Sequence, residues 1–200
     1  MNEKAYSSGL ISQSFWFIEI KKVIKLLSEG KTEQEIKAAC IEENLFGAAK
    51  EYRAKRIYGY IWNRVKHLDD SLIELFISSD LATQKLINLI AILKSDRLFF
   101  EFIYEVYREK NMLGVQTLTN SDVNIFFKNK DIQNEDIAQW TDGTKRRLSN
   151  IYLNFMTDAN LLTENGKEKT ITPPIVDIAL ERYLDVSGNK SILKAITGVN

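Results

Sequence analysis

Side chains that could hold a phosphate backbone recur at helical spacing in the last third of the chain. Successive residues of a helix turn by about 100°, which places Arg146, Arg147, Asn150 and Asn154 on one side of the helix. Lys145 belongs to the basic start of the same helix and is a further candidate contact. The opposite side is apolar at i, i+3, i+4 and i+7 spacing, from Leu148 to Ala159. The pattern predicts a helix that buries one face and offers hydrogen-bond donors to DNA from the other.

A second helix, expected at about residues 47–68, also concentrates positive charge, against the single acid Glu51. Helical geometry places three arginines and a tyrosine within about 80° of one another beside its apolar face. They are Arg53, Arg56, Tyr60 and Arg64. Guanidinium groups around an aromatic ring suit a phosphate backbone or a base stack. The alternative is that these arginines form ion pairs inside a helical bundle, with acids such as Asp69, Asp70 or Glu101.

Residues for catalysis or metal binding are scarce. His67 is the only histidine and Cys40 the only cysteine, and one of each cannot build a standard zinc site. The position of His67 near a helix end is typical of a residue favoured there by the helix dipole. The sequence lacks the glycine-rich loops that hold nucleotide phosphates. We therefore expect no catalytic residue, no metal, no cofactor and no enzymatic activity.

Residues 119–172 are predicted to form three helices followed by a hairpin. Thr119 and Asp122 have the spacing of a capping box, Asn134 can begin a second helix, and the basic helix follows. Asn165-Gly166 then gives the strongest short hairpin signal, because both central residues of a type I′ turn need φ > 0. The order of elements is helix, helix, longer helix and hairpin.

This order is typical of a winged helix. In such domains one helix enters the DNA major groove and the hairpin lies along the backbone. The hairpin supplies two further candidate DNA contacts, Lys167 and Lys169. A helical domain with an incidental hairpin is the alternative, and winged helices also serve as protein-docking modules.

The first 115 residues are predicted to be almost wholly helical. Ser12 or Ser14 can cap the first helix, and Thr32 with Glu35 has the spacing of a capping box for the second. Repeated 3.6-residue periodicity, short connections and the absence of proline before Pro173 favour a compact helical bundle. The pattern breaks at 114–117, which we take as a boundary. The expected fold is therefore mainly α. It has an N-terminal helical bundle over 1–115, then a winged-helix-like domain with one small β-hairpin and C-terminal helices over 116–200.

The composition is that of an ordinary globular protein, with 44% hydrophobic and 27% charged residues. The formal net charge is zero, so any attraction to phosphate must come from local patches. A single cysteine excludes an intrachain disulfide and fits a reducing cytosol. The N-terminus has no signal-peptide pattern, and the longest apolar run, around 86–93, is too short to span a bilayer. We expect a cytoplasmic protein that does not contact a membrane.

The order of several short segments resembles the BrxA family, whose members are small components of the BREX bacteriophage-defence systems. The matching stretches lie at 5–9, 41–45, 56–68, 89–98, 102–106, 145–148 and 158–162. Together they span nearly the whole chain, and their order and spacing are more specific than any single piece. Two departures affect the basic helix: Val65 stands where leucine is expected, and Tyr60 and Trp62 add aromatic rings.

The resemblance implies a non-enzymatic accessory protein, encoded beside a DNA methyltransferase, an ATPase and other defence components. Such proteins are thought to bind DNA, and their helical portion is similar to NusB-type folds, which bind RNA. Together with the two basic helices, this leads us to expect double-stranded DNA as a partner. Other BREX components, such as the methyltransferase and the ATPase, are further expected partners. The alternatives are a protein–protein scaffold within the defence complex and an RNA-binding NusB-like module.

Overall fold

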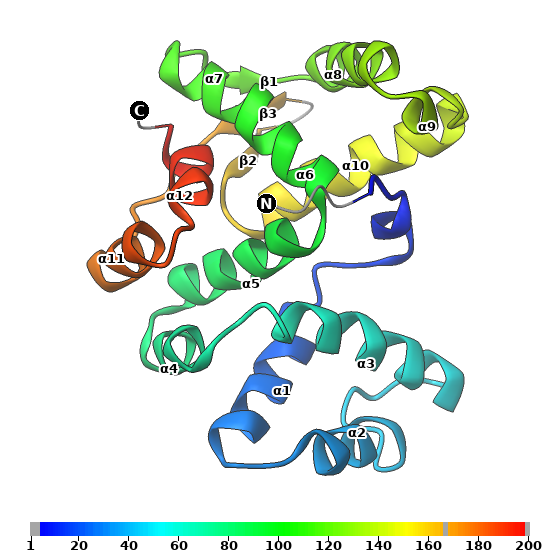
Figure 1. The fold of residues 1–200 in the computed structure, drawn as a ribbon, viewed down its shortest axis with the longest axis vertical. Helices are drawn as coiled ribbons and strands as arrows, with labels where there is room; N and C mark the ends of the chain where they lie inside the picture. The colour runs from blue at the N-terminus through cyan, green and yellow to red at the C-terminus, as the bar shows by residue number, and fades with distance from the viewer. Residues whose placement is uncertain (1–4, 166–167, 199–200) are drawn as a thin grey trace. The chain divides into compact units, whose positions relative to one another are not determined.

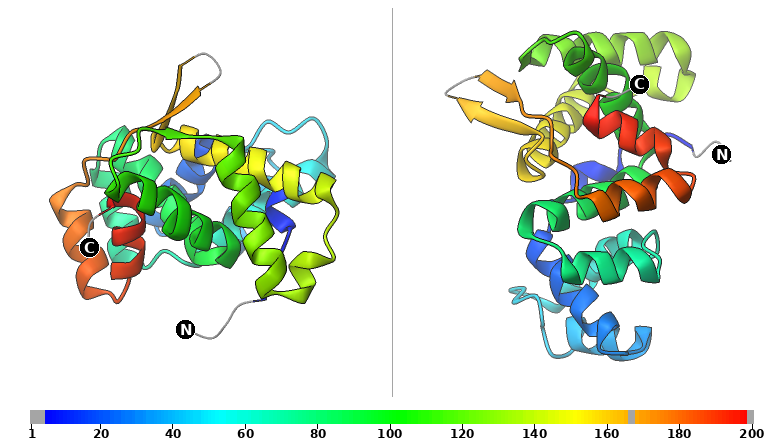
Figure 2. Two further views of the ribbon diagram at one scale, coloured as in Figure 1. Left: turned by 90° about the horizontal axis from the view of Figure 1, so that it is seen from above. Right: turned by 90° about the vertical axis from the view of Figure 1, so that its left-hand side faces the viewer.

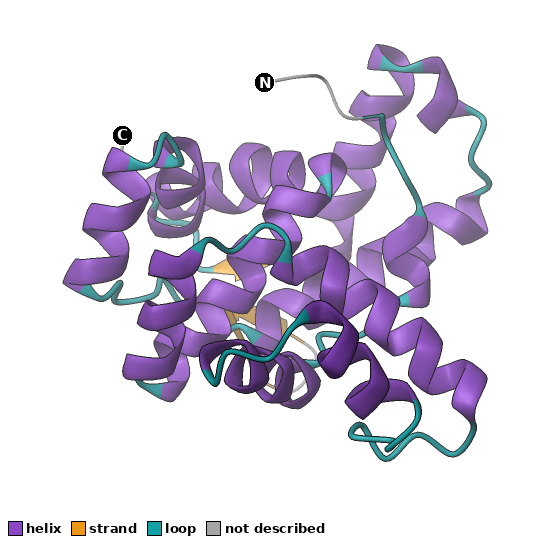
Figure 3. Cartoon of the chain, turned by 60° about the horizontal axis from the view of Figure 1, so that its bottom comes forward, coloured by secondary structure: helices purple, strands orange, loops and turns teal. Residues whose placement is uncertain are grey.

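The structure is a computed structural model, and it describes residues 5–165 and 168–198. Helices joined by short loops make up most of the described chain, and its strands belong to one small sheet (Figure 3). The prediction of a mainly α-helical protein is therefore confirmed. Among the described residues we find no helix both long and apolar enough to span a bilayer.

The chain divides into two compact units. The inner unit is Phe15–Ser95, and the split unit joins the segment up to Ser14 to everything from Asp96 onward. These divisions differ from the boundary expected at residue 115. The reason is that the helices from 97 to 112 pack with the C-terminal helix and with the helix that follows the expected boundary. That 1–115 and 116–200 are separate domains stays a prediction.

The inner unit consists of five helices in the described chain, labelled in Figure 1. They are α1 (Phe17–Ser28), α2 (Glu33–Ile41), α3 (Glu51–Val65), α4 (Asp70–Ser78) and α5 (Leu81–Ser95). α5 is buried on every side from Leu86 to Leu93, as expected of a helix that is apolar all round. It packs against α1, α3 and α4. The predicted capping box of Thr32 and Glu35 begins α2.

The start of α1 differs from the sequence prediction. A cap by Ser12 or Ser14 was expected, but α1 begins only after Trp16, which takes a left-handed conformation with φ of 47°. The carbonyl of Phe15 immediately before it accepts hydrogen bonds from Arg64 at 2.6 Å and Asn88 at 2.9 Å. These two buried donors lie far along the sequence and stabilise the backbone next to the left-handed Trp16, where no side chain caps the helix.

The split unit contains the predicted three helices and hairpin. They are α8 (Asn120–Gln133), α9 (Glu135–Ala138), α10 (Asp142–Asp158), β2 (Leu162–Asn165) and β3 (Glu168–Ile171). Around them lie η1 (Gly9–Ser12), α6 (Arg97–Phe102), the π-helix η2 (Ile103–Tyr107), α7 (Arg108–Met112), β1 (Thr117–Leu118), α11 (Ile178–Val186) and α12 (Lys190–Thr197). Thr119 and Asp122 form the predicted capping box, and Asn134 caps α9. The short strand β1 was not predicted.

The three strands form an antiparallel sheet in the order β1-β3-β2. The β2–β3 hairpin stands out from the helices of its own unit (Figure 2). Its register pairs Asn165 with Glu168. Asn165 is therefore the last residue of β2 and not, as the sequence predicted, a central residue of the turn. Gly166 itself lies outside the described residues.

Burial explains the observed register. It places Leu162 opposite Ile171, and both side chains are buried. The predicted turn would have placed Leu162 opposite Lys169 instead. The two registers differ by two residues, so each side chain keeps its face of the sheet and only its partner across the strands changes. The observed register pairs two buried apolar side chains, whereas the predicted one would pair Leu162 with a lysine.

Candidate nucleic-acid interface

The exposed side of α10 carries the predicted donors. The helix begins at Thr141, whose hydroxyl accepts a hydrogen bond from the Thr144 amide at 3.2 Å. Four of the five predicted residues of this helix are exposed and form what we call the α10 face: Arg146, Arg147, Asn150 and Asn154. Within the described residues, neither arginine side chain takes part in an ion pair or hydrogen bond. Both guanidinium groups are thus available to a ligand.

Lys145 has a different role. Its ammonium group lies 2.7 Å from a carboxylate oxygen of Asp131 on α8, and only 14% of its side chain is exposed. The Lys145 carbonyl also accepts a hydrogen bond from the Ser149 hydroxyl at 2.8 Å. The lysine therefore ties α10 to α8 and does not lie with the α10 face.

The hairpin has fewer available cations than the sequence suggested. Lys169 forms an ion pair with Glu164, its direct partner across the two strands, and this pair neutralises the charge locally. The other predicted hairpin contact, Lys167, lies outside the described residues.

Aromatic packing fixes the buried side of α10. The ring of Tyr152 stacks on Phe99 of α6, with centroids 4.6 Å apart, and contacts Phe102 at 5.4 Å and Phe127 of α8 at 6.2 Å. Burial raises the pKa of Tyr152 well above its ordinary value, so the ring stays neutral. The helix is thus held by a rigid apolar core, which keeps its outer face in a fixed orientation.

A buried ionic cluster in the same unit was not predicted. The Lys130 cluster comprises Lys130, Glu101, Glu105, Arg97 and Tyr6. Lys130 is 3% exposed and pairs with Glu101 at 2.6 Å and Glu105 at 2.7 Å. Glu101 also accepts hydrogen bonds from Arg97 at 2.7 Å and from the Tyr6 hydroxyl at 3.0 Å. The i, i+4 spacing of Arg97 and Glu101 is the one local signal that could have revealed part of it.

These contacts decide the charge states in the cluster. Burial acts to raise the pKa of the Glu101 carboxyl, but hydrogen bonds from Lys130 and Arg97 outweigh it and hold the pKa below its usual value. Burial acts to lower the pKa of Lys130, and the two glutamates reverse this so that the pKa is raised. Both groups are therefore charged at neutral pH. The cluster joins the N-terminal segment, α6, η2 and α8 through these ion pairs.

The predicted stripe on α3 separates into exposed and packed residues. Arg53 and Arg56 are exposed, and within the described residues neither forms an ion pair or hydrogen bond. Tyr60 instead stacks on Trp16 with centroids 5.6 Å apart. Arg64 is buried, with 1% of its surface exposed. The four residues therefore do not form one surface.

Arg64 holds the backbone of the inner unit. Its Nη1 donates to the Phe15 carbonyl at 2.6 Å, and its guanidinium carbon lies 5.5 Å from the Trp16 ring centroid. Burial lowers the pKa of Arg64 to about 9, although the nearby Glu19 acts against this. A guanidinium enclosed in this way is not accessible to a phosphate. Of the acids considered as ion-pair partners for the arginines of α3, Glu101 instead belongs to the Lys130 cluster.

The described residues show neither a metal-ligand group nor an exposed cysteine. We find no group of three or more histidine, cysteine, aspartate or glutamate side chains there that could hold a metal ion. Cys40 is buried in α2, and burial raises the pKa of its thiol to about 11. Cys40 is therefore a packed thiol and not a reactive one.

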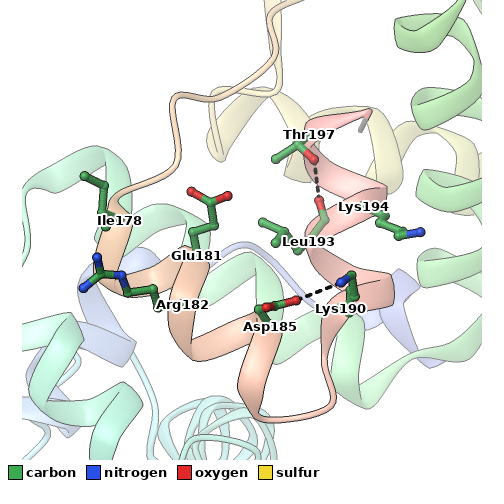
Figure 4. A pocket seen from close by; sticks show the side chains of 8 residues that line it. All are labelled: Ile178, Glu181, Arg182, Asp185, Lys190, Leu193, Lys194 and Thr197. Carbon is green, nitrogen blue, oxygen red and sulfur yellow. Dashed lines mark hydrogen bonds and ion pairs between the residues drawn. The ribbon is translucent and has the colours of Figure 1, made fainter. Parts of the chain in front are cut away.

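A hollow of about 440 Å³ lies between α11 and α12 (Figure 4). Its lining carries charges of both signs, among them Glu181, Arg182 and Asp185. Asp185 pairs with Lys190 at 3.1 Å, which reduces the charge available to a ligand. Arg182, Lys190 and Lys194 face the two acids Glu181 and Asp185, so the net charge of the lining is only +1, which is small for a site that binds a phosphate backbone.

Comparison with known proteins points to one family. The chain matches the family model described as BrxA over residues 4–188. It is 36% identical over 198 residues to a protein of Bacillus cereus (strain H3081.97) named BREX protein BrxA, with 99% of each chain covered. It is also similar to the crystal structure of an uncharacterised protein from Magnetospirillum magneticum, with a TM-score of 0.82 and 17% identity. That match covers 98% of this chain and 100% of the other, and at this identity it shows a shared fold alone.

Proposed function

The chain belongs to the BrxA family, and from this membership we propose that it is a non-enzymatic accessory protein of a BREX phage-defence system that binds double-stranded DNA. The α10 face is the proposed contact surface. Family membership supports the defence role, and the arrangement of the exposed side chains supports the ligand.

The order of elements in the split unit supports a winged-helix interpretation. β1 precedes α8, α9 and α10, and the β2–β3 hairpin follows with β3 between the other two strands. In this interpretation α10 enters the major groove, and the hairpin lies beside the phosphate backbone. The sheet and the aromatic core behind Tyr152 would hold α10 at a fixed angle to the duplex.

The observation that carries the proposal is the pair of exposed guanidinium groups of Arg146 and Arg147, which have no ion pair or hydrogen bond among the described residues and lie beside two exposed asparagines. Arginine can bind a phosphate or a guanine edge with two parallel hydrogen bonds, and asparagine can do the same with adenine. Because the net charge of the chain is zero, binding would depend on this local surface.

One observation favours the scaffold as a second candidate function. On α8, Ile125 is 55% exposed and Ile132 is 87% exposed, and a spacing of seven residues places both on one side of the helix. Exposed isoleucines at this spacing suit a protein partner. A scaffold role would use this surface and would not need the α10 face.

The test is the salt dependence of duplex binding by the full-length protein. Fluorescence anisotropy with a labelled duplex should give a steep fall in affinity with added salt. The double variant Arg146→Gln, Arg147→Gln should weaken binding and reduce the slope of log affinity against log salt by up to about 1.8, at about 0.9 for each phosphate contact. Its melting temperature should stay the same because both side chains are exposed.

The matched control changes two exposed cations of the C-terminal helices, Arg182→Gln and Lys190→Gln, and should bind duplex like the unmodified protein. If the unmodified protein shows no duplex affinity at low salt, or if the α10 variant binds as well as the control, DNA binding by this face is refuted. The scaffold role would then be the better account.

A further inference from the structure

One exposed face of α3 has a composition that the proposed function does not use. Tyr52, Arg56, Gly59 and Asn63 follow one another at i, i+4, i+7 and i+11, and all four are exposed. This spacing places them in one stripe along the helix, about 16 Å long at 1.5 Å per residue. We call this stripe the Tyr52 face. α1, α2 and α5 pack against α3 within the inner unit (Figure 1), and the Tyr52 face is on the side they leave open.

Positive charge borders the Tyr52 face on both sides. At 100° per residue, Arg53 lies on one flank and Lys55 on the other, and both are exposed. Within the described residues, the side chains of Arg53, Lys55 and Arg56 form no ion pair. Other exposed lysines of the same unit do form pairs, such as Lys25 with Glu29. The charge along α3 is therefore not neutralised within the unit and complements an anionic partner.

Gly59 has no explanation in the packing of the unit itself. Glycine in the interior of a helix is unfavourable relative to alanine. A Cβ added at Gly59 would meet no atom within 4 Å, so no neighbour in the chain requires its absence. What the glycine does provide is bare helix backbone in the middle of the Tyr52 face. A partner can approach there more closely than at any residue with a side chain.

The side chains of the Tyr52 face favour a nucleic-acid strand over a protein. A protein that docks on a helix typically buries aliphatic anchors at this spacing, and the stripe has none. Tyr52, by contrast, is 67% exposed and offers a flat ring, with cations on either side. Aromatic rings bordered by positive charge are the usual platform for unpaired bases, which stack on the ring while the cations bind the backbone. The bases of a duplex are covered by their neighbours and cannot stack in this way.

We propose that the Tyr52 face binds a single, unpaired DNA strand, with one base stacked on Tyr52, phosphates bound by Arg53, Lys55 and Arg56, and the backbone close to Gly59. The choice of DNA over RNA rests on the proposed function, whereas the single-stranded ligand rests on the face itself. The chain would thus have two DNA surfaces of different kinds, α10 for a duplex and α3 for an unpaired strand.

The first experiment measures the anisotropy of a labelled oligothymidine with the full-length protein. Tyr52→Ala should weaken binding by at least about fivefold, the lower end of the loss for one stacked base, and Tyr52→Phe should restore it because the ring is kept. Lys37→Gln, an exposed cation of α2 outside the face, is the control and should bind like the unmodified protein. Equal binding by Tyr52→Ala and the control would overturn the proposal.

Gly59→Ala separates binding from folding. The change should raise the melting temperature, because alanine favours the helix, and yet weaken oligothymidine binding by closing the backbone approach. A variant that is more stable but binds more weakly cannot be explained by misfolding. If Gly59→Ala binds the strand as tightly as the unmodified protein, the close approach at Gly59 is wrong.

Two further arms identify the ligand. Tighter binding of oligouridine RNA than of oligothymidine would overturn the choice of DNA. If Tyr52→Ala binds oligothymidine normally but no longer binds a protein partner, the face belongs to a protein. The Arg146→Gln, Arg147→Gln variant should weaken duplex binding and leave oligothymidine binding unchanged. If no duplex binding exists but Tyr52 still supports strand binding, the proposed function fails and this inference stands.

Discussion

The ammonium group of Lys130 on α8 lies 2.6 Å from a carboxylate oxygen of Glu101 on α6, and only 3% of the lysine side chain is exposed. The sequence does not indicate that these two residues pair, because the two helices meet only in the folded chain. Burying a charge is costly unless it is paired. The pair therefore makes the packing of α8 against α6 depend on both partners.

The first prediction concerns this pair. Lys130→Met should lower the free energy of unfolding by about 3 kcal/mol, the lower end of the cost of leaving a buried charge without its partner, since Glu101 keeps Arg97 and Tyr6. Urea unfolding measures the change. As a control, Lys25→Met removes an exposed pair with Glu29 and should cost no more than about 0.5 kcal/mol. Equal stability of the two variants would contradict the importance of the buried pair.

The second prediction is a pH dependence. The pKa of Glu101 lies below its ordinary value in the folded protein, because hydrogen bonds from Lys130 and Arg97 outweigh the opposing effect of burial. A carboxyl with a lowered pKa stabilises the fold fully above its unfolded pKa of about 4.3 and loses this contribution as the pH falls through the folded value. The free energy of unfolding should therefore decrease below about pH 4.3. Glu101→Gln should show a flatter decrease over this range; an unchanged pH profile would rule out Glu101 as its source.

Local signals were read correctly from the sequence where both partners lie within one turn. The capping boxes of Thr32 with Glu35 and of Thr119 with Asp122 depend on a three-residue spacing, and both are present. The exposed position of Arg146 and Arg147 follows from helical periodicity in the same way.

Distant partners explain what the sequence could not show. Arg64 donates to a carbonyl 49 residues away, and a helical wheel places it beside the apolar face without revealing whether it is buried. Lys145 has the same ambiguity, since Asp131 belongs to another helix. Four of the predicted contact residues have partners within the chain instead of free side chains. They are Arg64, Tyr60, Lys145 and Lys169.

The third prediction separates the arginines of α3. Arg64→Met should lower the free energy of unfolding by about 2 kcal/mol, the typical cost of losing a buried hydrogen bond from a charged donor. Arg53→Gln and Arg56→Gln should each change it by less than about 0.5 kcal/mol, since both side chains are exposed. Thermal and urea unfolding of the three variants, side by side, make the comparison. Similar stabilities for all three would mean that Arg64 does not hold the Phe15 carbonyl in solution.

The fourth prediction tests the hairpin register. Thr163 lies directly opposite Thr170, so the double variant Thr163→Cys, Thr170→Cys should form a disulfide under mild oxidation. With Asn165 and Gly166 as the turn, Thr163 would instead face Glu168, so Thr163→Cys, Glu168→Cys is the matched control. Mass spectrometry after alkylation reports the bridge. Cys40 should not compete, because burial raises the pKa of its thiol to about 11. Preferential cross-linking of the control would restore the predicted turn.

The last prediction separates positioning from contact on α10. Lys145 is tied to Asp131 at 2.7 Å with 14% of its side chain exposed, whereas Arg146 and Arg147 are exposed. Lys145→Gln should therefore lower the free energy of unfolding by about 1 kcal/mol and leave the salt slope of duplex binding unchanged, since no phosphate contact is lost. Asp131→Asn should have the same effect, and the double variant should cost little more than either single one, because both remove the same interaction.

The opposite pattern is expected for the neighbouring arginines, whose loss should reduce the salt slope without changing stability. If Lys145→Gln flattens the slope by about 0.9, the value for one phosphate, while Asp131→Asn leaves both slope and stability unaltered, then Lys145 contacts DNA directly. In that case the ion pair with Asp131 does not hold α10 to α8, and the α10 face begins one residue earlier than its exposed side chains indicate.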